Sequence, residues 1–372
     1  MVQQTTLDDL LDGPRFRTLC LAVAAGLDEG VHRAVTALLE PITASYGLLA
    51  DLRPEQDTAD ALAAVLSDVD ATELASWTDP MRFLPVLQHS VDSAMPWQPP
   101  FVEDAITGLP SVRNALRAVA EAVVASPAAS WWGTDVDRTA QWVTQPVRNG
   151  VPEVVATSGP MAEVLDRWRR NVVASEGRSR VAGPVVDSAG GAWWSTPHEF
   201  GDEPGGAAIL PSSTRRVDGL GSSGSTLVED SFGDDEVLLR SLQPPAGARV
   251  FEVHGAADWA RLVERYPMPA RWARRRVWWE STGREEHWFL PDYEAVAADH
   301  DAVHVSVQGY LAAAGRAIDV HGGATMLAGW SPDETFWLTD DIVIEPDAER
   351  WQLRSAGAED EDEDDEPRWV RT

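Results

Sequence analysis

The hydrophobic pattern of this chain changes its period near residue 127, and this change constrains the fold more than any other feature. Before it, apolar residues recur at three- and four-residue spacing, as in residues 18–39 and 111–126. After it, short stretches alternate between apolar and polar residues, which is the pattern of half-buried strands. The sequence therefore predicts an α+β fold: a helical N-terminal region plus a C-terminal, mainly antiparallel β-sheet with helices.

The same pattern predicts a division of the chain. Residues 201–236 are rich in Gly, Ser, Pro and Asp, which is typical of a linker or a mobile loop. The unbroken acidic run at 359–366 predicts a solvated, disordered tail, although binding of another molecule stays open for it. The expected parts are an all-α region at 1–126, a connecting α+β segment at 127–200 that can join the C-terminal sheet, the linker at 201–236, an α+β domain at 237–355 and the acidic tail at 356–372.

Several local elements are predicted within the C-terminal half. The pattern indicates helices at 256–265 and 292–299. It indicates strands at 274–281 (RRRVWWES) and 301–311 (DAVHVSVQGYL). The turn-forming sequence SPDE predicts a β-hairpin that joins ATMLAGW to TFWLTD.

Composition excludes several classes of partner. The chain has 30 basic residues, all of them Arg, against 60 acidic residues, so its net charge is −30. A surface of this charge repels phosphate backbones and anionic lipids, and we expect no nucleic-acid partner and no membrane partner. The N-terminus carries acids and no base before Arg15, unlike a signal peptide, and the one cysteine, Cys20, lies in an apolar run. We therefore expect a cytoplasmic protein.

Familiar catalytic and metal-binding spacings are missing from the sequence. The eight histidines include no HExxH pair, and there is no GxSxG, no Walker loop and no GxGxxG that follows a strand and opens a helix. We expect no metal and no cofactor. Two pairs, Glu252 with His254 and His304 with Ser306, would each share one face of a strand. They are either polar groups aimed into a site or solvated strand faces.

Tryptophan is the unusual residue, with 17 in the chain. Three pairs recur, at 131–132, 193–194 and 278–279, and each is followed closely by small or hydroxyl residues. They indicate either core packing or a pocket with aromatic walls. The cluster RWARRRVWW at 271–279 is the main basic island, and it is either an anion-binding patch or a set of arginines paired with nearby acids.

The stretch DAVHVSVQGYLAAAGRAIDV, followed by ATMLAGWSPDETFWL, resembles a group of actinobacterial proteins. Among these it resembles the aziridine-forming proteins of azabicycle antibiotic pathways, such as azinomycin biosynthesis. The similarity covers about the last third of the chain. It implies a cytoplasmic enzyme that works with a small partner protein and closes an aziridine ring by displacing sulfate with an amine.

Our first hypothesis is therefore a cofactor-free enzyme of specialised metabolism that acts on a small polar substrate. An intramolecular amine substitution needs an aligned substrate, a base for the ammonium proton and donors for the departing anion. A pocket between the two regions of the chain would suit it, because sites favour such interfaces. The candidate bases are Glu280, Asp292 and Asp333, the candidate anion-holding residues are Arg138, Arg276 and His304, and the candidate walls are Trp132, Trp194, Trp279 and Trp330.

The second hypothesis is a non-catalytic acidic interaction protein, for example an immunity or regulatory protein, that binds a basic partner. The acidic surface, the acidic tail and the absence of catalytic motifs favour it, because acidic proteins attract basic partners by electrostatic steering. A deep, closed pocket would count against it.

Overall fold

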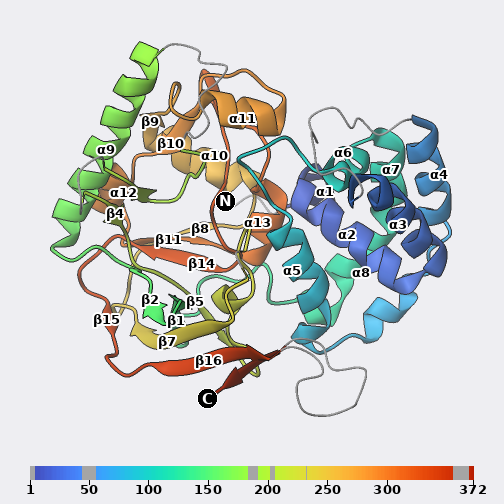
Figure 1. Ribbon diagram of the computed structural model, residues 1–372, viewed down its shortest axis with the longest axis horizontal. Helices are drawn as coiled ribbons and strands as arrows, with labels where there is room; N and C mark the ends of the chain where they lie inside the picture. Colours follow the sequence, from blue (N-terminus) through green and yellow to red (C-terminus); the bar gives the residue numbers. More distant parts are fainter. Residues whose placement is uncertain (1–4, 44–55, 183–191, 202–205, 232, 355–367) are drawn as a thin grey trace.

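The structure is a computed structural model that describes residues 5–43, 56–182, 192–201, 206–231, 233–354 and 368–372. Figure 1 shows the N-terminal helices, coloured blue to teal, packed beside a region built on a β-sheet. The predicted α+β fold with a helical N-terminal region is confirmed. Within the described residues, no helix is both long enough and apolar enough to cross a membrane.

The N-terminal region is built around one buried helix, α2 (Pro14–Leu27), which begins with Pro at its first position. Phe16, Leu19 and Cys20 of α2 are fully buried, which agrees with the apolar run in the sequence. The other helices of the region are α1 (Leu7–Asp12), α3 (Glu29–Thr43), α4 (Gln56–Leu66), α5 (Leu84–Asp92), α6 (Val102–Thr107), α7 (Pro110–Ala115) and α8 (Arg117–Ala125), with 3-10 turns η2 (Thr72–Ser76), η3 (Pro80–Phe83) and η4 (Pro127–Ala129).

A mixed sheet organises the second region, in the order β17-β16-β7-β1-β5-β14-β11-β8. Its neighbouring strands are antiparallel except β8 and β11, which are parallel. The strands of this path are β1 (Gln141–Arg148), β5 (Ser212–Val217), β7 (Glu236–Gln243), β8 (Val250–Val253), β11 (Ala302–Val305), β14 (Glu334–Trp337), β16 (Glu349–Arg354) and β17 (Arg368–Arg371); β2 (Val151–Pro152), β6 (Gly221–Ser222) and β15 (Val343–Ile344) pair at its margins.

Helices and three short two-stranded sheets complete this region. The helix α10 (Ala256–Arg265), at the predicted position, follows β8 and lies on the crossover to its parallel partner β11. The remaining elements are α9 (Met161–Ala182), α11 (Arg275–Thr282), α12 (Tyr293–Asp299), α13 (Val307–Ala313), the 3-10 turn η5 (Ser223–Ser225), and the strand pairs β3 (His198–Glu199) with β4 (Ala208–Ile209), β9 (Pro267–Pro269) with β10 (Phe289–Pro291), and β12 (Ile318–Val320) with β13 (Gly323–Thr325).

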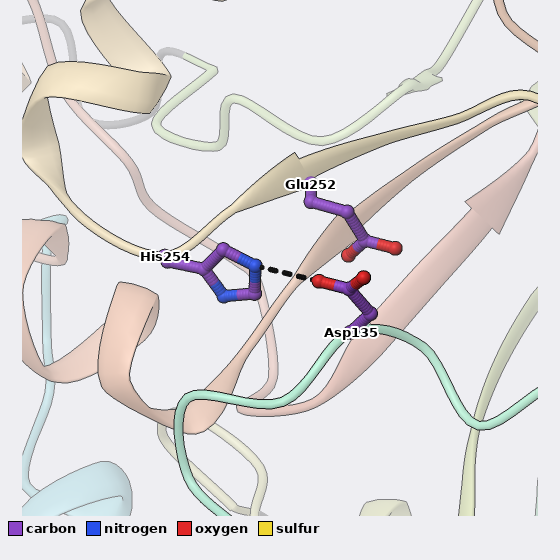
Figure 2. Close-up of side chains that lie close together, drawn as sticks. All are labelled: Asp135, Glu252 and His254. Carbon is purple, nitrogen blue, oxygen red and sulfur yellow. Dashed lines mark hydrogen bonds and ion pairs between the residues drawn. The ribbon is translucent and has the colours of Figure 1, made fainter. Parts of the chain in front are cut away.

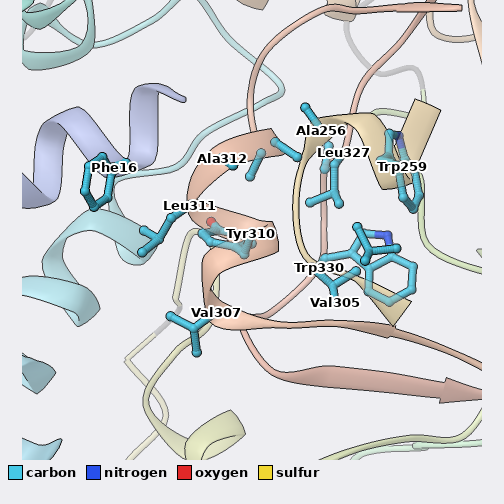
Figure 3. Packing of buried hydrophobic residues seen from close by; sticks show 14 of the residues in the cluster. Phe16, Ala256, Trp259, Val305, Val307, Tyr310, Leu311, Ala312, Leu327 and Trp330 are labelled. Atoms are coloured by element: carbon cyan, nitrogen blue, oxygen red, sulfur yellow. The ribbon is translucent and has the colours of Figure 1, made fainter. Parts of the chain in front are cut away.

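The short helix α13 joins the two regions. Figure 3 shows its Leu311 beside Phe16 of the helical region, while Trp259 and Trp330 lie on the opposite side, in the sheet region. All of these side chains are buried and belong to one continuous hydrophobic cluster. A Cβ atom at Gly309 would collide with the carbonyl of Val253, so the close approach of α13 to β8 requires glycine there. The core therefore spans both regions.

The predicted linker at 201–236 contains sheet. Strands β4, β5 and β6 all lie within it, and β5 pairs with β1 on one side and β14 on the other. The Ser and Thr residues that suggested a linker supply interior hydrogen bonds: Ser213 donates to Gln141, and Thr214 bonds to Ser222. The composition was therefore typical of a loop although part of this stretch is a central strand.

The predicted strand at 274–281 is wrong, because most of it forms the helix α11. Arg274 and Trp278 lie one helical turn apart and are both fully buried, which gives the segment a helical face. The helix ends at Gly283, whose φ of 69° is the left-handed conformation that glycine adopts readily.

The predicted strand at 301–311 is correct only as far as Val305. Ser306 then caps α13 by accepting a hydrogen bond from the backbone of Gly309, so the chain turns from strand to helix. The predicted hairpin is also wrong: β13 pairs with β12, while β14 pairs with β11 and β5.

Part of the predicted disordered tail at 356–372 is a strand, because residues 368–371 form β17 and pair with β16. Trp369 of β17 is buried and belongs to a small hydrophobic cluster with Leu239 and Val237. This apolar contact stabilises the pairing. The acidic run at 359–366 lies outside the described residues.

Candidate functional site

Two groups of polar residues stand out, and the first lies where the parallel strands β8 and β11 end. The register pairs Glu252 with His304, and two residues further on, past the ends of the two strands, stand His254 and Ser306. Because alternate residues of a strand face the same side, these polar side chains gather at one place. Figure 2 shows Glu252 and His254 converging with Asp135, which comes from the loop after the helical region. We call Asp135, Glu252, His254, His304 and Asp333 the strand-end cluster.

The loop at 130–137 lies across these strand ends and is held there by several contacts. Asp135 Oδ1 lies 2.9 Å from His254 Nε2, and the backbone N–H of Val136 donates to Glu252 Oε1 at 3.3 Å. Thr134 accepts a hydrogen bond of 2.9 Å from Arg215, whose guanidinium lies 4.9 Å from the ring centre of Trp131. The loop therefore brings residues from the helical side of the chain onto the sheet.

Beneath this loop runs a buried chain of charged groups. His304 is fully buried, with Nδ1 2.6 Å from Glu252 and Nε2 3.4 Å from Asp333. Burial alone would lower the pKa of His304, but its hydrogen bonds to Asp333 and Glu252 outweigh burial and raise that pKa to about 9. Although burial opposes it, hydrogen bonds from His304 and Arg215 hold the pKa of Asp333 below its usual range. The imidazolium and the guanidinium thus compensate the two carboxylates.

Asp333 adopts a backbone conformation that residues other than glycine rarely take, with a φ of 63°. Its carboxylate accepts hydrogen bonds from the backbone N–H of Arg215 at 3.0 Å and from Arg215 Nε at 2.8 Å. These bonds, together with His304, hold the side chain in place. The surrounding contacts therefore stabilise a strained position next to the strand ends.

The second group lines a cavity between the helical region and the sheet region, where the sequence predicted a pocket. Its volume is about 320 Å³. Both regions contribute walls, and we call it the arginine cavity. The residues that line it are Asp12, Pro14, Arg15, Arg17, Ala94, Met95, Pro96, Gln98, Pro100, Asp104, Ala105, Glu229, Ser281, Thr282, Arg284, Gly315, Arg316 and Ala317.

Three arginines of this cavity pair with acids. Arg15 forms an ion pair with Asp104 and also donates to the carbonyl of Ser90 at 2.9 Å. Arg316 lies 3.4 Å from a carboxylate oxygen of Asp12. Arg284 binds Glu286 and Asp319, at 2.6 and 2.7 Å. The charges of these three guanidinium groups are therefore compensated within the protein.

Arg17 differs from them. Its Nη1 donates to the carbonyl oxygens of Leu11 and Asp12, at 2.9 and 2.8 Å, and within the described residues it forms no ion pair with a carboxylate. The residue is only 9% exposed, and its Nε has no hydrogen-bond partner there. Burial lowers the pKa of Arg17 to about 10, so the group stays charged at neutral pH. Asp104 and Asp12 attract this charge without forming an ion pair with it, and an anion bound in the cavity would give the guanidinium a direct partner.

Glu229 is the acid of the cavity that belongs to the sheet region. Its carboxyl oxygens accept hydrogen bonds from Tyr310 at 2.9 Å and from the backbone of Gly329 at 2.6 Å. Burial raises the pKa of Glu229 to about 8, although both hydrogen bonds oppose the change. A carboxyl group with a pKa near neutrality can accept and release a proton at physiological pH.

The structure brings together two of the residues predicted for the site, Asp333 and His304, in the strand-end cluster. A third, Trp132, lies in the loop that carries Asp135. Its backbone carbonyl accepts a hydrogen bond from Gln308 of α13, and its ring is buried against Phe83. The sequence left open whether Glu252 with His254 and His304 with Ser306 are aimed into a site or form solvated strand faces. The structure brings the two pairs together, because His254 contacts Ser306 and His304 contacts Glu252.

The other predicted site residues do not belong to the strand-end cluster. All of them are described by the structure, and none is among the residues that line the arginine cavity. Their positions are as follows: Glu280 and Arg276 pair with each other along α11 at 2.9 Å, Asp292 caps α12 and lies 3.2 Å from Arg169, Arg138 donates to the carbonyl of Ala248, Trp194 donates to the carbonyl of His198, Trp279 is 50% exposed, and Trp330 is fully buried against Trp259 and Phe336.

The three Trp pairs do not lie on strands. Trp131 and Trp132 lie in a turn, Trp193 and Trp194 lie in a segment without regular secondary structure, and the third pair is on α11. The basic island around α11 is paired locally: the fully buried Arg274, for example, binds Glu199 at 3.1 Å. Of the two interpretations of this island, local pairing describes the contacts.

Sequence reasoning missed Arg17, Glu229 and Asp135. A signal existed for Arg17, because Arg15 and Arg17 are the only charged residues of the otherwise apolar helix α2. No signal existed for Glu229 or Asp135, since both lie in loops and reach their partners only in the folded chain.

Comparisons with known proteins identify no relative. No protein-family model, no curated protein and no solved structure matches the chain. Functional conclusions therefore depend on the geometry of the two groups of residues.

Proposed function

We propose that the protein is an enzyme that acts on a small polar molecule with a negatively charged group, bound in the arginine cavity. The observation that carries the proposal is Arg17, a buried guanidinium that lines the cavity and forms no ion pair within the described residues. Guanidinium groups bind carboxylate, sulfate and phosphate groups well because their N–H donors match the geometry of these anions. An anionic substrate would supply the missing negative charge.

The size of the cavity supports a small substrate. A volume of about 320 Å³ corresponds to about ten water molecules at ~30 Å³ each. This is the lower end of the range for small-molecule sites. The surrounding Arg15, Arg284 and Arg316 raise the local potential even though acids pair with them.

Glu229 supports a reaction as well as binding. Burial raises its pKa to about 8, so the fraction of Glu229 that is deprotonated near neutral pH is a stronger base than an ordinary carboxylate and can take a proton from a substrate amine. Arg17 can stabilise negative charge on a leaving group in the same cavity. The two residues supply the base and the anion donor that an intramolecular amine substitution needs.

The reaction that we propose is the one implied by the resemblance of the C-terminal third. The amine nitrogen attacks the neighbouring carbon, the bond from that carbon to the sulfate oxygen breaks, and its electron pair leaves with sulfate. The proton of the nitrogen passes to Glu229. A three-membered aziridine ring and a sulfate ion are formed, and no oxidant or reductant is needed.

A turnover assay followed by mass spectrometry tests this function. The purified protein is incubated with an O-sulfonated vicinal amine, with and without a candidate small partner protein. We expect release of sulfate with ring closure, and loss of that release in Arg17→Met. Exposed Arg33, on α3, provides the matched control, and Arg33→Met should keep the activity. Unchanged activity in Arg17→Met would contradict the proposed role of the arginine cavity.

The proposal includes a cytoplasmic location and a small protein partner, as the resemblance implies. The second hypothesis, a non-catalytic acidic protein that binds a basic partner, predicts a different result in the same assay. In that case no turnover occurs in either mixture, and a basic protein is captured at low salt and released at high salt.

A further inference from the structure

We propose that Asp135, Glu252 and His254 form a zinc-binding site at the ends of the parallel strands, separate from the arginine cavity. One ligand atom from each residue lies within 4.8 Å of the others. Figure 2 shows the three side chains directed toward one another from β8 and from the loop that crosses it. The proposal goes beyond the proposed function and does not depend on it, since the two sites share none of these residues.

The donor set fits a first-row metal ion. Imidazole nitrogen and carboxylate oxygen are both ligands of zinc, and a site with three protein ligands keeps a fourth position for water or substrate. Oxygen-preferring Ca²⁺ and Mg²⁺ would gain nothing from the imidazole. Asp135 is 75% exposed and Glu252 is 19% exposed, so the fourth position has access to solvent.

The hydrogen bonds behind the ligands match those of metal sites. His254 Nδ1 lies 3.1 Å from the hydroxyl of Ser306, and Glu252 Oε2 lies 2.6 Å from Nδ1 of His304. Ser306 and His304 are both buried, so these bonds fix the orientation of the two side chains that would face the metal. In metal sites such outer hydrogen bonds orient the ligands and set the tautomer of the histidine.

The surroundings of His254 allow its ring to act as a metal ligand. Ser306 Oγ lies 3.1 Å from His254 Nδ1 and 3.3 Å from the carbonyl of Val253, and it accepts a hydrogen bond of 3.0 Å from the backbone of Gly309. When the ring hydrogen is on Nδ1 and is donated to Ser306, Nε2 can bind a metal ion together with Asp135 and Glu252.

Zinc binding can be measured by calorimetry, with excess Ca²⁺ and Mg²⁺ present to saturate sites made only of carboxylates. We expect one Zn²⁺ per chain. Asp135→Asn and His254→Ala should each weaken binding by ~10-fold or more, because each removes a ligand atom. Co²⁺ should give visible absorption bands in the wild type that both variants lack.

The chain offers a matched control in His321, an 86% exposed histidine 3.2 Å from Glu264 and outside the site. His321→Ala should bind zinc like the wild type. Asp135→Asn changes an exposed side chain, so its thermal unfolding should stay close to that of the wild type and exclude misfolding. If the wild type binds no Zn²⁺ under these conditions, or if Asp135→Asn and His254→Ala bind it as His321→Ala does, a proton alone joins Asp135 to His254 and the proposal is wrong.

Discussion

The arginine cavity and the strand-end cluster lie at opposite ends of α13. Each contains a buried charged side chain, and the two charges have different kinds of partner. In the strand-end cluster the buried carboxylate of Asp333 has both His304 and Arg215 as partners. In the arginine cavity the buried guanidinium of Arg17 has only carbonyl oxygens. The carboxylate of Asp333 is in contact with two cationic side chains, whereas within the described residues Arg17 contacts no carboxylate. A net charge of −30 therefore describes the surface of this protein and does not predict the sign of its sites.

The largest effect on the free energy of unfolding is expected in α13, the helix that lies between the two sites. Leu311 of α13 is fully buried in the cluster that spans both regions. Leu311→Ala should lower the free energy of unfolding by about 2–5 kcal/mol, through lost burial and the remaining cavity. Urea denaturation measures this loss, and sulfate binding and zinc binding should weaken together. A loss below about 1 kcal/mol would show that α13 does not connect the sites.

The next effect separates the two sites by their charge compensation. Arg17→Met should raise the free energy of unfolding of the anion-free protein by about 1–4 kcal/mol, because a buried charge that forms no ion pair among the described residues is replaced by an apolar side chain. Arg33→Met, on an exposed side chain, should stay within about 0.5 kcal/mol of the wild type. Strong destabilisation of Arg17→Met would show that the protein itself compensates the charge of Arg17.

A smaller effect concerns the pH dependence that Glu229 gives to stability. Burial raises its pKa in the folded protein to about 8, above the value in the unfolded chain. Its contribution is therefore fully present below the unfolded pKa of ~4.3 and is lost as the pH rises through about 8. Thermal unfolding from pH 5 to pH 9 should show a decline in the wild type that Glu229→Gln reduces. Equal slopes in the two proteins would contradict the assignment.

The smallest effect is expected for a change in the strand-end cluster that should not alter binding in the arginine cavity. Asp135→Asn should leave sulfate binding unchanged, because Asp135 does not line the arginine cavity. It should also change the free energy of unfolding by no more than about 0.5 kcal/mol, since the side chain is 75% exposed. Titration of sulfate into the variant checks the first statement. Weaker sulfate binding would mean that the two sites are coupled.

Elements with marked ends and one clear periodicity could be predicted from the sequence. The helix at 256–265 follows Gly255 and has a regular apolar stripe, and its bounds agree with α10. Elements whose composition is typical of another structure could not be predicted. In α11 the aromatic and β-branched residues favour a strand by propensity, yet tertiary packing of Arg274 and Trp278 makes it a helix. In β5 the Ser and Thr residues resemble a linker, yet they form interior hydrogen bonds.

The candidate site was predictable to a similar, partial extent. Strand alternation placed Glu252 with His254 and His304 with Ser306, and the parallel register of β8 and β11 then joined the pairs. That register depends on a crossover that the sequence does not specify. Asp135 lies 119 positions before His254, and only folding brings its loop across the strands. The arginine cavity likewise forms from segments of both regions, so no local sequence pattern predicts it.

Calorimetric titration of inorganic sulfate into the wild type and Arg17→Met measures whether Arg17 binds an anion in the arginine cavity. We predict one sulfate per wild-type chain and the same affinity in Arg33→Met. In Arg17→Met we predict binding weaker by ~30-fold or more, since losing one partner of a buried charge pair costs at least about 2 kcal/mol. Equal affinity in Arg17→Met and the wild type, or no sulfate binding by the wild type, would contradict this account.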